Sequence, residues 1–340
     1  MRLKHFLRLL PLSLAVVFGA NAAQADEVHK LKLAHFLPAV SNAHANIFEP
    51  WCEQLKEESE GRLQCEIYPS LQLGGTPATL ADMARSGAAD IVWTAPSYSA
   101  GKFPRVEVLE LPFLLPYGGM AGNKLIWQFY QDHAQDDFKP YKVLAVFGDG
   151  GMDFHVRPKP VETVDDLKGL KLRASSRSAA NTLTALGATP VSMPPAQMTE
   201  SISKGVIDGA LAAWEVVPPT KLDEVTKYHS SMEEGKPAIG YTVLTVLMNQ
   251  KKYDSLPDDL KEILDRNSGD ALVERFGREW DIFTEQAKAD ADPDSIVLIS
   301  DENYAEFQKV AEKLQSDWAA NAPENINPQE LLEAARQLLD

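Results

Sequence analysis

The same unit of helix, glycine and strand occurs twice in this chain, and this repeat constrains the fold more than any other feature. The corresponding positions are Pro77 and Pro195 at the helix start, Gly87 and Gly205 at the helix end, and Asp90 and Asp208 before the strand. Proline suits the first turn of a helix, and glycine accepts the left-handed conformation that ends one. We expect two α/β lobes that present the segments after these strands to a shared crevice. The alternative is chance similarity between two common units.

The order of elements before the first copy also predicts an α/β fold. Residues 31–36 and 62–68 have the pattern of strands, and the run 45–60 between them has the pattern of an amphipathic helix. This order opens a doubly wound sheet, in which ligands bind beyond the carboxyl ends of the strands. The length of the chain exceeds that of one typical core, so two domains are expected.

The N-terminus has the features of a secretory signal peptide. Three basic residues precede an apolar run at 9–20, and Ala23-Gln24-Ala25 follows it. We expect residues 1–25 to be the signal peptide, with cleavage after about Ala25. The apolar run is too short for a durable membrane span, and no later stretch is long enough. We therefore expect an exported protein with no membrane insertion after cleavage.

Charge and cysteine content limit the partners. The formal net charge is −16 at pH 7, which argues against nucleic acid and anionic membrane surfaces as partners. Cys52 and Cys65 fall on an expected helix and the next strand, and either a disulfide or two buried thiols would fit. Neither cysteine supports a metal site, and the histidines show no ligand spacing. We expect no metal and no cofactor.

Arg173 is the first candidate for ligand binding. It ends an apolar and basic strand, and small hydroxyl residues and a helical run follow it. A planar guanidinium at a strand end can hold a carboxylate by two parallel hydrogen bonds. The alternative is an arginine that is solvated or paired within the protein.

Each copy of the repeat has a tryptophan after its strand. Trp93 lies beside small and hydroxyl residues, and Trp214 lies beside Glu215. An indole among small residues suits a pocket with apolar walls and a few polar groups, although packing in the core is the alternative. The remaining candidate ligand-binding residues are Phe36, Phe113, Asp153, Phe154 and Met193.

Three motifs resemble one family. They are LKGLK at 167–171 followed by Arg173, the segment from Leu186 to Pro194, and the G-x-x-D-G pattern at 205–209. The chain resembles the solute-binding proteins of the TRAP (tripartite ATP-independent periplasmic) transporters, the DctP-like family, from about Leu31 to at least Leu298. The resemblance implies a two-lobed periplasmic binding protein fold with a long lobe-spanning helix. Lobe I would comprise 26–149 with about 238–280, and lobe II 150–237 with about 281–340.

The resemblance also implies a function. The protein would be a periplasmic receptor that captures a small organic carboxylate or zwitterion between its lobes and delivers it to the membrane permease subunits. Arg173 matches the carboxylate-binding arginine of the family by motif. Many members have a basic or amide-bearing residue near Asp153 and an asparagine near Glu215, so these acidic residues put dicarboxylates and sialic-acid-like sugars in doubt.

Two alternatives to a carboxylate receptor follow from the acidic residues. Glu215 and Trp214 suit an ammonium group, so the solute could be a small amine or amino alcohol; an aromatic acid held by Trp93, Phe113 and Trp214 is a further possibility. Asp153, Asp208 and Glu215 could be acid and base groups of a secreted hydrolase. No nucleophile elbow, phosphate loop or HExxH motif occurs in the sequence. We therefore expect a binding protein and not an enzyme.

Overall fold

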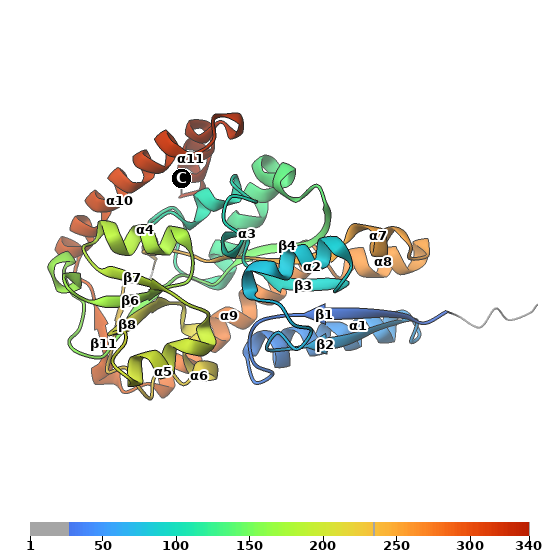
Figure 1. Ribbon diagram of the computed structural model, residues 1–340, viewed down its shortest axis with the longest axis horizontal. Helices are drawn as coiled ribbons and strands as arrows, with labels where there is room; N and C mark the ends of the chain where they lie inside the picture. Colours follow the sequence, from blue (N-terminus) through green and yellow to red (C-terminus); the bar gives the residue numbers. More distant parts are fainter. Residues whose placement is uncertain (1–26, 234, 340) are drawn as a thin grey trace, which may run out of the picture.

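Two β-sheets form the centres of two lobes in the computed structural model, which describes residues 27–233 and 235–339 (Figure 1). One sheet has five strands in the order β2-β1-β3-β10-β4, and the other has six in the order β11-β9-β5-β8-β6-β7. This arrangement confirms the expected α/β fold with two lobes. The predicted cleavage after about Ala25 lies outside the described residues.

The first lobe contains the five-stranded sheet. Its strands are β1 (His29–Ala34), β2 (Leu63–Tyr68), β3 (Ile91–Thr94), β4 (Tyr141–Gly148) and β10 (Val243–Asn249). Strands β1, β2 and β3 run parallel, whereas β10 pairs antiparallel with both β3 and β4. Its helices are α1 (Glu49–Glu58), α2 (Leu80–Ser86), α3 (Gly119–Phe129), α7 (Gln250–Asp254) and α8 (Asp258–Arg266). Every residue of β10 is buried, so a late segment of the chain completes the first sheet.

The second lobe contains the six-stranded sheet. Its strands are β5 (Asp153–Val156), β6 (Lys171–Ala174), β7 (Thr189–Ser192), β8 (Gly209–Ala212), β9 (Tyr228–Ser231) and β11 (Ile296–Leu298). Its helices include α4 (Arg177–Ala185), α5 (Met198–Ser203) and α6 (Val217–Thr220). The chain first crosses between the sheets at residues 149–152, where Gly150 and Gly151 have positive φ angles of 86° and 103°. Glycine tolerates this backbone conformation.

The predicted repeat is confirmed by the hydrogen bonds of its two aspartates. Asp90 Oδ2 accepts from the backbone N–H of Lys32, and Asp208 Oδ2 accepts from that of Lys171, both at 2.8 Å. Gly87 and Gly205 both adopt the left-handed conformation, with φ angles of 81° and 69°. Each aspartate thus joins its strand to the neighbouring parallel strand in the same way.

Helix α9 (Asp270–Asp290) extends over 21 residues and contacts both lobes (Figure 1). In the first lobe Phe276 stacks on Phe147, with ring centroids 3.7 Å apart. Toward the other end, the Lys288 ammonium lies 5.8 Å from the Trp214 ring of the second lobe. These contacts agree with the lobe-spanning helix that the family resemblance implies.

The C-terminal helices α10 (Asp301–Asn321) and α11 (Pro328–Arg336) arch from the second lobe back over the first (Figure 1). Helix α10 contacts α4, and α11 contacts the 3-10 helix η4 (Val106–Glu110) of the first lobe. The sequence predicted that residues 281–340 belong to the second lobe, whereas α11 within this range contacts the first lobe. The domain boundaries therefore stay a proposal.

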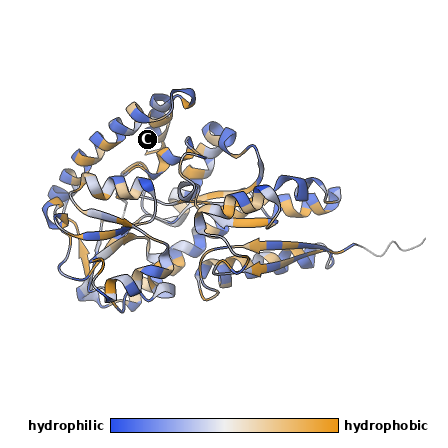
Figure 2. Cartoon of the chain, in the orientation of Figure 1, coloured by the Kyte–Doolittle hydropathy of each residue, from blue (hydrophilic) through white to orange (hydrophobic). Residues whose placement is uncertain are grey.

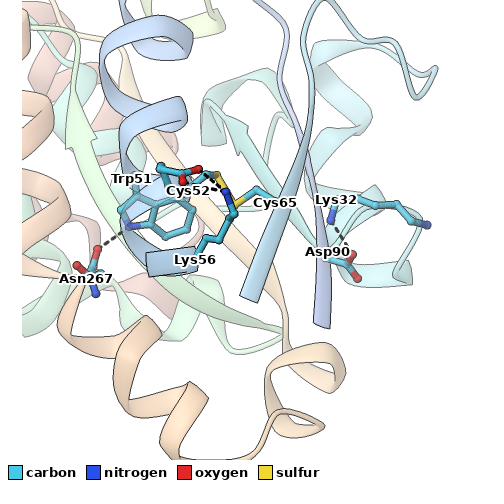
Figure 3. The surroundings of a disulfide bond; sticks show 8 residues. Lys32, Trp51, Cys52, Lys56, Cys65, Asp90 and Asn267 are labelled. Carbon is cyan, nitrogen blue, oxygen red and sulfur yellow. Dashed lines mark hydrogen bonds and ion pairs between the residues drawn. A yellow bond between two sulfur atoms is a disulfide. The ribbon is translucent and has the colours of Figure 1, made fainter. Parts of the chain in front are cut away.

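A disulfide joins Cys52 of α1 to Cys65 of β2 (Figure 3). The two Cα atoms are 5.6 Å apart, which is within the ordinary range for such a bond. Beside it, the Trp51 indole N–H donates to the Asn267 carbonyl at 2.7 Å, which joins α1 to the segment after α8. The structure therefore decides between the two alternatives that the sequence left open.

Hydrophobic residues concentrate on the strands and on the inner helix faces, as the colouring in Figure 2 shows. Buried aromatic and aliphatic side chains fill the space on both sides of each sheet, which is the main source of stability for a fold of this kind. Within the part of the chain that the structure describes, no helix is both long and apolar enough to cross a membrane.

Candidate ligand-binding site

Arg173 lies near the carboxyl end of β6 and is only 3% exposed. Its Nε donates to the Met193 carbonyl at 3.2 Å. Burial lowers the pKa of the guanidinium, while the Tyr98 hydroxyl and the Asp149 and Glu215 carboxyls act in the opposite direction. A guanidinium has more N–H donors than these contacts use, and it keeps its charge when buried. Arg173 can therefore present a charged donor pair to a carboxylate.

Tyr98 approaches Arg173 from the first lobe. It ends the 3-10 helix η3 (Pro96–Tyr98), directly after β3, and burial raises its pKa to about 12. Its ring makes an edge contact with Phe36 at 5.5 Å between centroids. The phenol therefore remains protonated at neutral pH. The two rings provide an aromatic wall with one hydroxyl group near the guanidinium.

Trp93 stands behind this wall. Its ring stacks on Phe36 at 4.8 Å and contacts Phe276 and Trp280 of α9, each at 6.4 Å. It has no exposed surface, and its indole N–H has no hydrogen-bond partner among the described residues. Tyr98 is therefore the member of this aromatic group that interacts with Arg173, and Phe36 lies between Tyr98 and Trp93.

Glu215 lies on the second-lobe 3-10 helix η9 (Trp214–Val216) and is 4% exposed. Burial and, to a smaller extent, the charge of Asp149 raise the pKa of its carboxyl to about 8, and Arg173 opposes the rise. Its Oε2 has no hydrogen-bond partner within the described residues. At neutral pH the Glu215 carboxyl is therefore mostly protonated and has hydrogen-bonding capacity to offer.

Asp149 lies at the crossing between the lobes. Its carboxylate accepts from the backbone N–H groups of Gly151 at 3.2 Å and Thr242 at 3.0 Å. Burial raises its pKa to about 6, and these hydrogen bonds limit the rise. The hydrogen bonds of Asp149 thus stabilise the segment that crosses between the lobes, and its charge also acts on Arg173 and Glu215.

Asp153 supports Trp214. Its Oδ2 accepts from the Trp214 indole N–H at 2.6 Å, the Ser231 hydroxyl at 2.6 Å and the Tyr117 hydroxyl at 2.9 Å. The Trp214 ring also meets His155 edge-on, with centroids 5.1 Å apart. This network fixes the indole of the second lobe to the first lobe through Tyr117. We therefore treat Asp153 as a support for the site.

Three other predicted site residues have different surroundings. Phe154 lies in the second-lobe core and packs against Phe307 at 6.2 Å, and Phe113 meets Tyr304 edge-on at 5.1 Å. Met193 contributes the backbone carbonyl that orients Arg173, and its side chain is partly buried. We leave Phe113 and Phe154 out of the site that we propose below.

Glu110 joins the lobes beside Arg173, and the sequence analysis did not identify it. Its Oε2 accepts from the Ser176 hydroxyl of the second lobe and its Oε1 from the Val243 N–H of the first, both at 3.0 Å. Ser176 also caps α4 by accepting from the Ala179 N–H at 3.1 Å. Nothing near Glu110 in the sequence could indicate this role, because its partners come from distant segments.

A cavity of about 990 Å³ lies between α4, α10 and the first lobe. Its lining includes Ser97, Glu110, Arg177 and Trp318, but not Arg173. Arg173 is instead enclosed by residues of both lobes. The arrangement as a whole offers one buried cation, an aromatic wall and a protonated carboxyl, which suits binding of a small ring-bearing anion.

Comparisons with known proteins agree on one family. The model of the bacterial extracellular solute-binding protein family 7 (DctP) matches residues 33–321. The chain is 30% identical to the 2,3-diketo-L-gulonate-binding periplasmic protein YiaO of Escherichia coli, over 62% of this chain and 63% of that protein. The chain thus spans somewhat less than two thirds of the length of that relative.

Two solved structures resemble the chain more fully. A TRAP solute-binding protein from a marine metagenome, in complex with 3-hydroxybenzoate and described as specific for aromatic acid ligands, is 37% identical with a TM-score of 0.87, covering 92% of this chain and 98% of that one. A TRAP solute-binding protein from Rhodoferax ferrireducens T118, with copurified benzoate, has the same identity, TM-score and coverage.

Proposed function

Because the chain belongs to the bacterial extracellular solute-binding protein family 7, we propose that it is a periplasmic receptor for a small aromatic monocarboxylate. The solute would be enclosed between the lobes and passed to the membrane permease of a TRAP transporter. The observation that carries the proposal is Arg173, a buried guanidinium beside the aromatic pair Phe36 and Tyr98. Export by a signal peptide cleaved near Ala25 belongs to the same proposal.

The charges around Arg173 favour one carboxylate on the ligand. One guanidinium balances one carboxylate, and a second anionic group would meet the field of Asp149. An aromatic ring suits the wall of Phe36 and Tyr98 because offset and edge contacts between rings are favourable. The two structural relatives that hold benzoate and 3-hydroxybenzoate support the same class of solute.

The amine alternative is weaker because Glu215 is mostly protonated at neutral pH. With its pKa raised to about 8, the side chain supplies little negative charge to pair with an ammonium group. The nearby Arg173 would repel such a group as well. Two of the three carboxylates of the hydrolase alternative have structural partners, because Asp208 accepts from the Lys171 N–H and Asp153 accepts from the Trp214 indole N–H. The family consists of solute-binding proteins.

The test is calorimetric titration of the protein with benzoate, succinate and ethanolamine, repeated on Arg173→Met. We expect benzoate to bind, and the substitution to weaken its binding by at least about 30-fold, because a buried charged hydrogen-bond partner is removed. Arg177→Met is the matched control, since Arg177 is exposed and lines the outer cavity. Binding of ethanolamine alone would favour the amine alternative. Equal benzoate affinity in wild type and Arg173→Met would overturn the assignment of the anchor.

A further inference from the structure

Glu215 Oε2 is a buried oxygen atom without a hydrogen-bond partner among the described residues. Leaving a buried polar atom unpaired costs about 1–3 kcal/mol, so a native protein retains such an atom where a partner arrives at another stage. The carboxyl is 4% exposed, and it follows β8 at the border between the lobes. A ligand held between the lobes is a partner that can reach it.

Glu215 and Tyr98 lie on corresponding elements of the two copies of the repeat. Tyr98 lies on the 3-10 helix after β3, and Glu215 lies on the 3-10 helix after the corresponding strand β8. The charges of Arg173 and Glu215 both act on the Tyr98 hydroxyl, and Arg173 also acts on Glu215. The three side chains are therefore close enough for their charges to interact. A ring acid anchored on Arg173 would have Glu215 beside it.

The other acidic groups near this region are already occupied. Asp149 accepts from two backbone N–H groups, and Glu110 accepts from Ser176 and Val243. Two buried carboxyls in the described part of the chain retain an unpaired oxygen, Glu215 Oε2 and Asp153 Oδ1. The other oxygen of Asp153 already accepts three hydrogen bonds, whereas Glu215 is the carboxyl of the two whose charge acts on Arg173. A protonated carboxyl can donate to a phenol oxygen or accept from a phenol hydroxyl, and it does not repel the carboxylate of the ligand.

We propose that Glu215 makes the receptor selective for ring acids that carry a hydroxyl group over the unsubstituted acid, by hydrogen bonding to that hydroxyl. The inference rests on the proposed function, because it takes Arg173 as the anchor for the ring carboxylate. Selectivity arises because an unsubstituted ring leaves the buried oxygen unpaired, whereas a hydroxylated ring satisfies it. A site with a buried polar group rejects a ligand that lacks the matching group.

The experiment is calorimetric titration with benzoate, 3-hydroxybenzoate and 4-hydroxybenzoate. The wild type should bind at least one hydroxybenzoate about tenfold or more tightly than benzoate, as one satisfied hydrogen bond allows. Glu215→Met removes the polar group at similar length, so its affinities for the three acids should differ by no more than about twofold. Glu215→Gln keeps a donor and an acceptor and should retain the preference. Glu57→Gln, an exposed position on α1, is the control.

The outcomes separate the two proposals. If the wild type binds benzoate as tightly as both hydroxybenzoates, or if Glu215→Met keeps the preference, the role of Glu215 is wrong while the aromatic acid receptor stands. If the wild type binds none of the three acids, the proposed function fails and this inference fails with it. Thermal unfolding of each variant without ligand shows that a loss of preference is not a loss of folding.

Discussion

At the scale of single residues, the buried carboxyl of Glu110 makes stability depend on pH. Burial raises its pKa to about 8 from the ordinary value of 4.5. The folded protein therefore binds a proton that the unfolded chain releases between these values. The resulting stabilisation is fully present below about pH 4.5 and is lost as the pH rises through about 8.

Between about pH 6.5 and 8.5 the free energy of unfolding of the wild type should decrease. We predict that this decrease is smaller in Glu110→Gln by roughly 1–2 kcal/mol. Glutamine does not ionise, and it can accept from the Val243 N–H through its single amide oxygen while its amide nitrogen donates to the Ser176 hydroxyl oxygen. Glu215 and Asp149, whose pKa values are also raised, continue to titrate in the variant. The free energy of unfolding is measured by urea denaturation at several pH values.

The chosen pH window avoids the buried histidines. Burial lowers the pKa of His35 to about 3, so that side chain destabilises the fold only as the pH falls below about 6.5. Glu57→Gln, which changes an exposed side chain, should leave the wild-type slope unchanged. Identical slopes for wild type and Glu110→Gln would show that Glu110 is ionised in the folded protein.

At the scale of elements, the disulfide between α1 and β2 contributes stability through the unfolded state. The two cysteines are separated by 13 positions in the sequence, and closing a loop of that length stabilises a fold by about 3 kcal/mol in the chain-entropy estimate. We predict that the double variant Cys52→Ala and Cys65→Ala loses about that much stability. Denaturant unfolding under oxidising conditions measures the loss.

Reduction of the wild type provides the matched comparison for the disulfide. A reducing agent should lower the stability of the wild type and leave that of the double variant unchanged. Benzoate affinity should be similar in both proteins, because the disulfide joins α1 to β2 and Arg173 lies on β6. Equal stability of the oxidised wild type and the double variant would show that the bond contributes nothing to folding.

At the scale of the whole molecule, the burial of Arg173 implies that the lobes separate before a solute enters. Arg173 is 3% exposed, and Glu110 bonds to Ser176 across the border between the lobes. A ligand held by both lobes stabilises their closed arrangement over the open one. The glycines at 150 and 151 lie where the chain crosses and can absorb the change in backbone angles.

We predict that benzoate makes the protein more compact in small-angle scattering, because it binds the closed arrangement in preference. The same ligand should stabilise the fold by about 2.7 kcal/mol at a concentration 100-fold above its dissociation constant. At that concentration Arg173→Met, with an affinity at least about 30-fold lower, should be stabilised by about 0.9 kcal/mol or less. A radius of gyration that stays constant at saturating benzoate would indicate that the lobes do not close on the ligand.

Local patterns predicted much of the fold. The repeat, the Gly turns and the aspartates before strands were read from short segments, and the structure places Asp90 and Asp208 in equivalent hydrogen bonds. The sequence also identified Arg173 at the end of a strand as the anchor, which stays a proposal. It did not identify Tyr98 as part of the wall. Tyr98 lies on the 3-10 helix after the strand of the first copy, and Glu215 lies on the 3-10 helix after the strand of the second copy.

The sequence by itself determined the two-lobed α/β class and the family, and it indicated Arg173 as the candidate anchor, because caps, turns and strand patterns depend on neighbouring residues. Only the tertiary structure decided that Glu110 bonds to Ser176, that Asp153 supports Trp214 and that Cys52 pairs with Cys65. It also decided that Glu215 is buried, which raises the pKa of its carboxyl. Each of these depends on burial and on partners from distant segments, and no local pattern encodes the position of a distant segment.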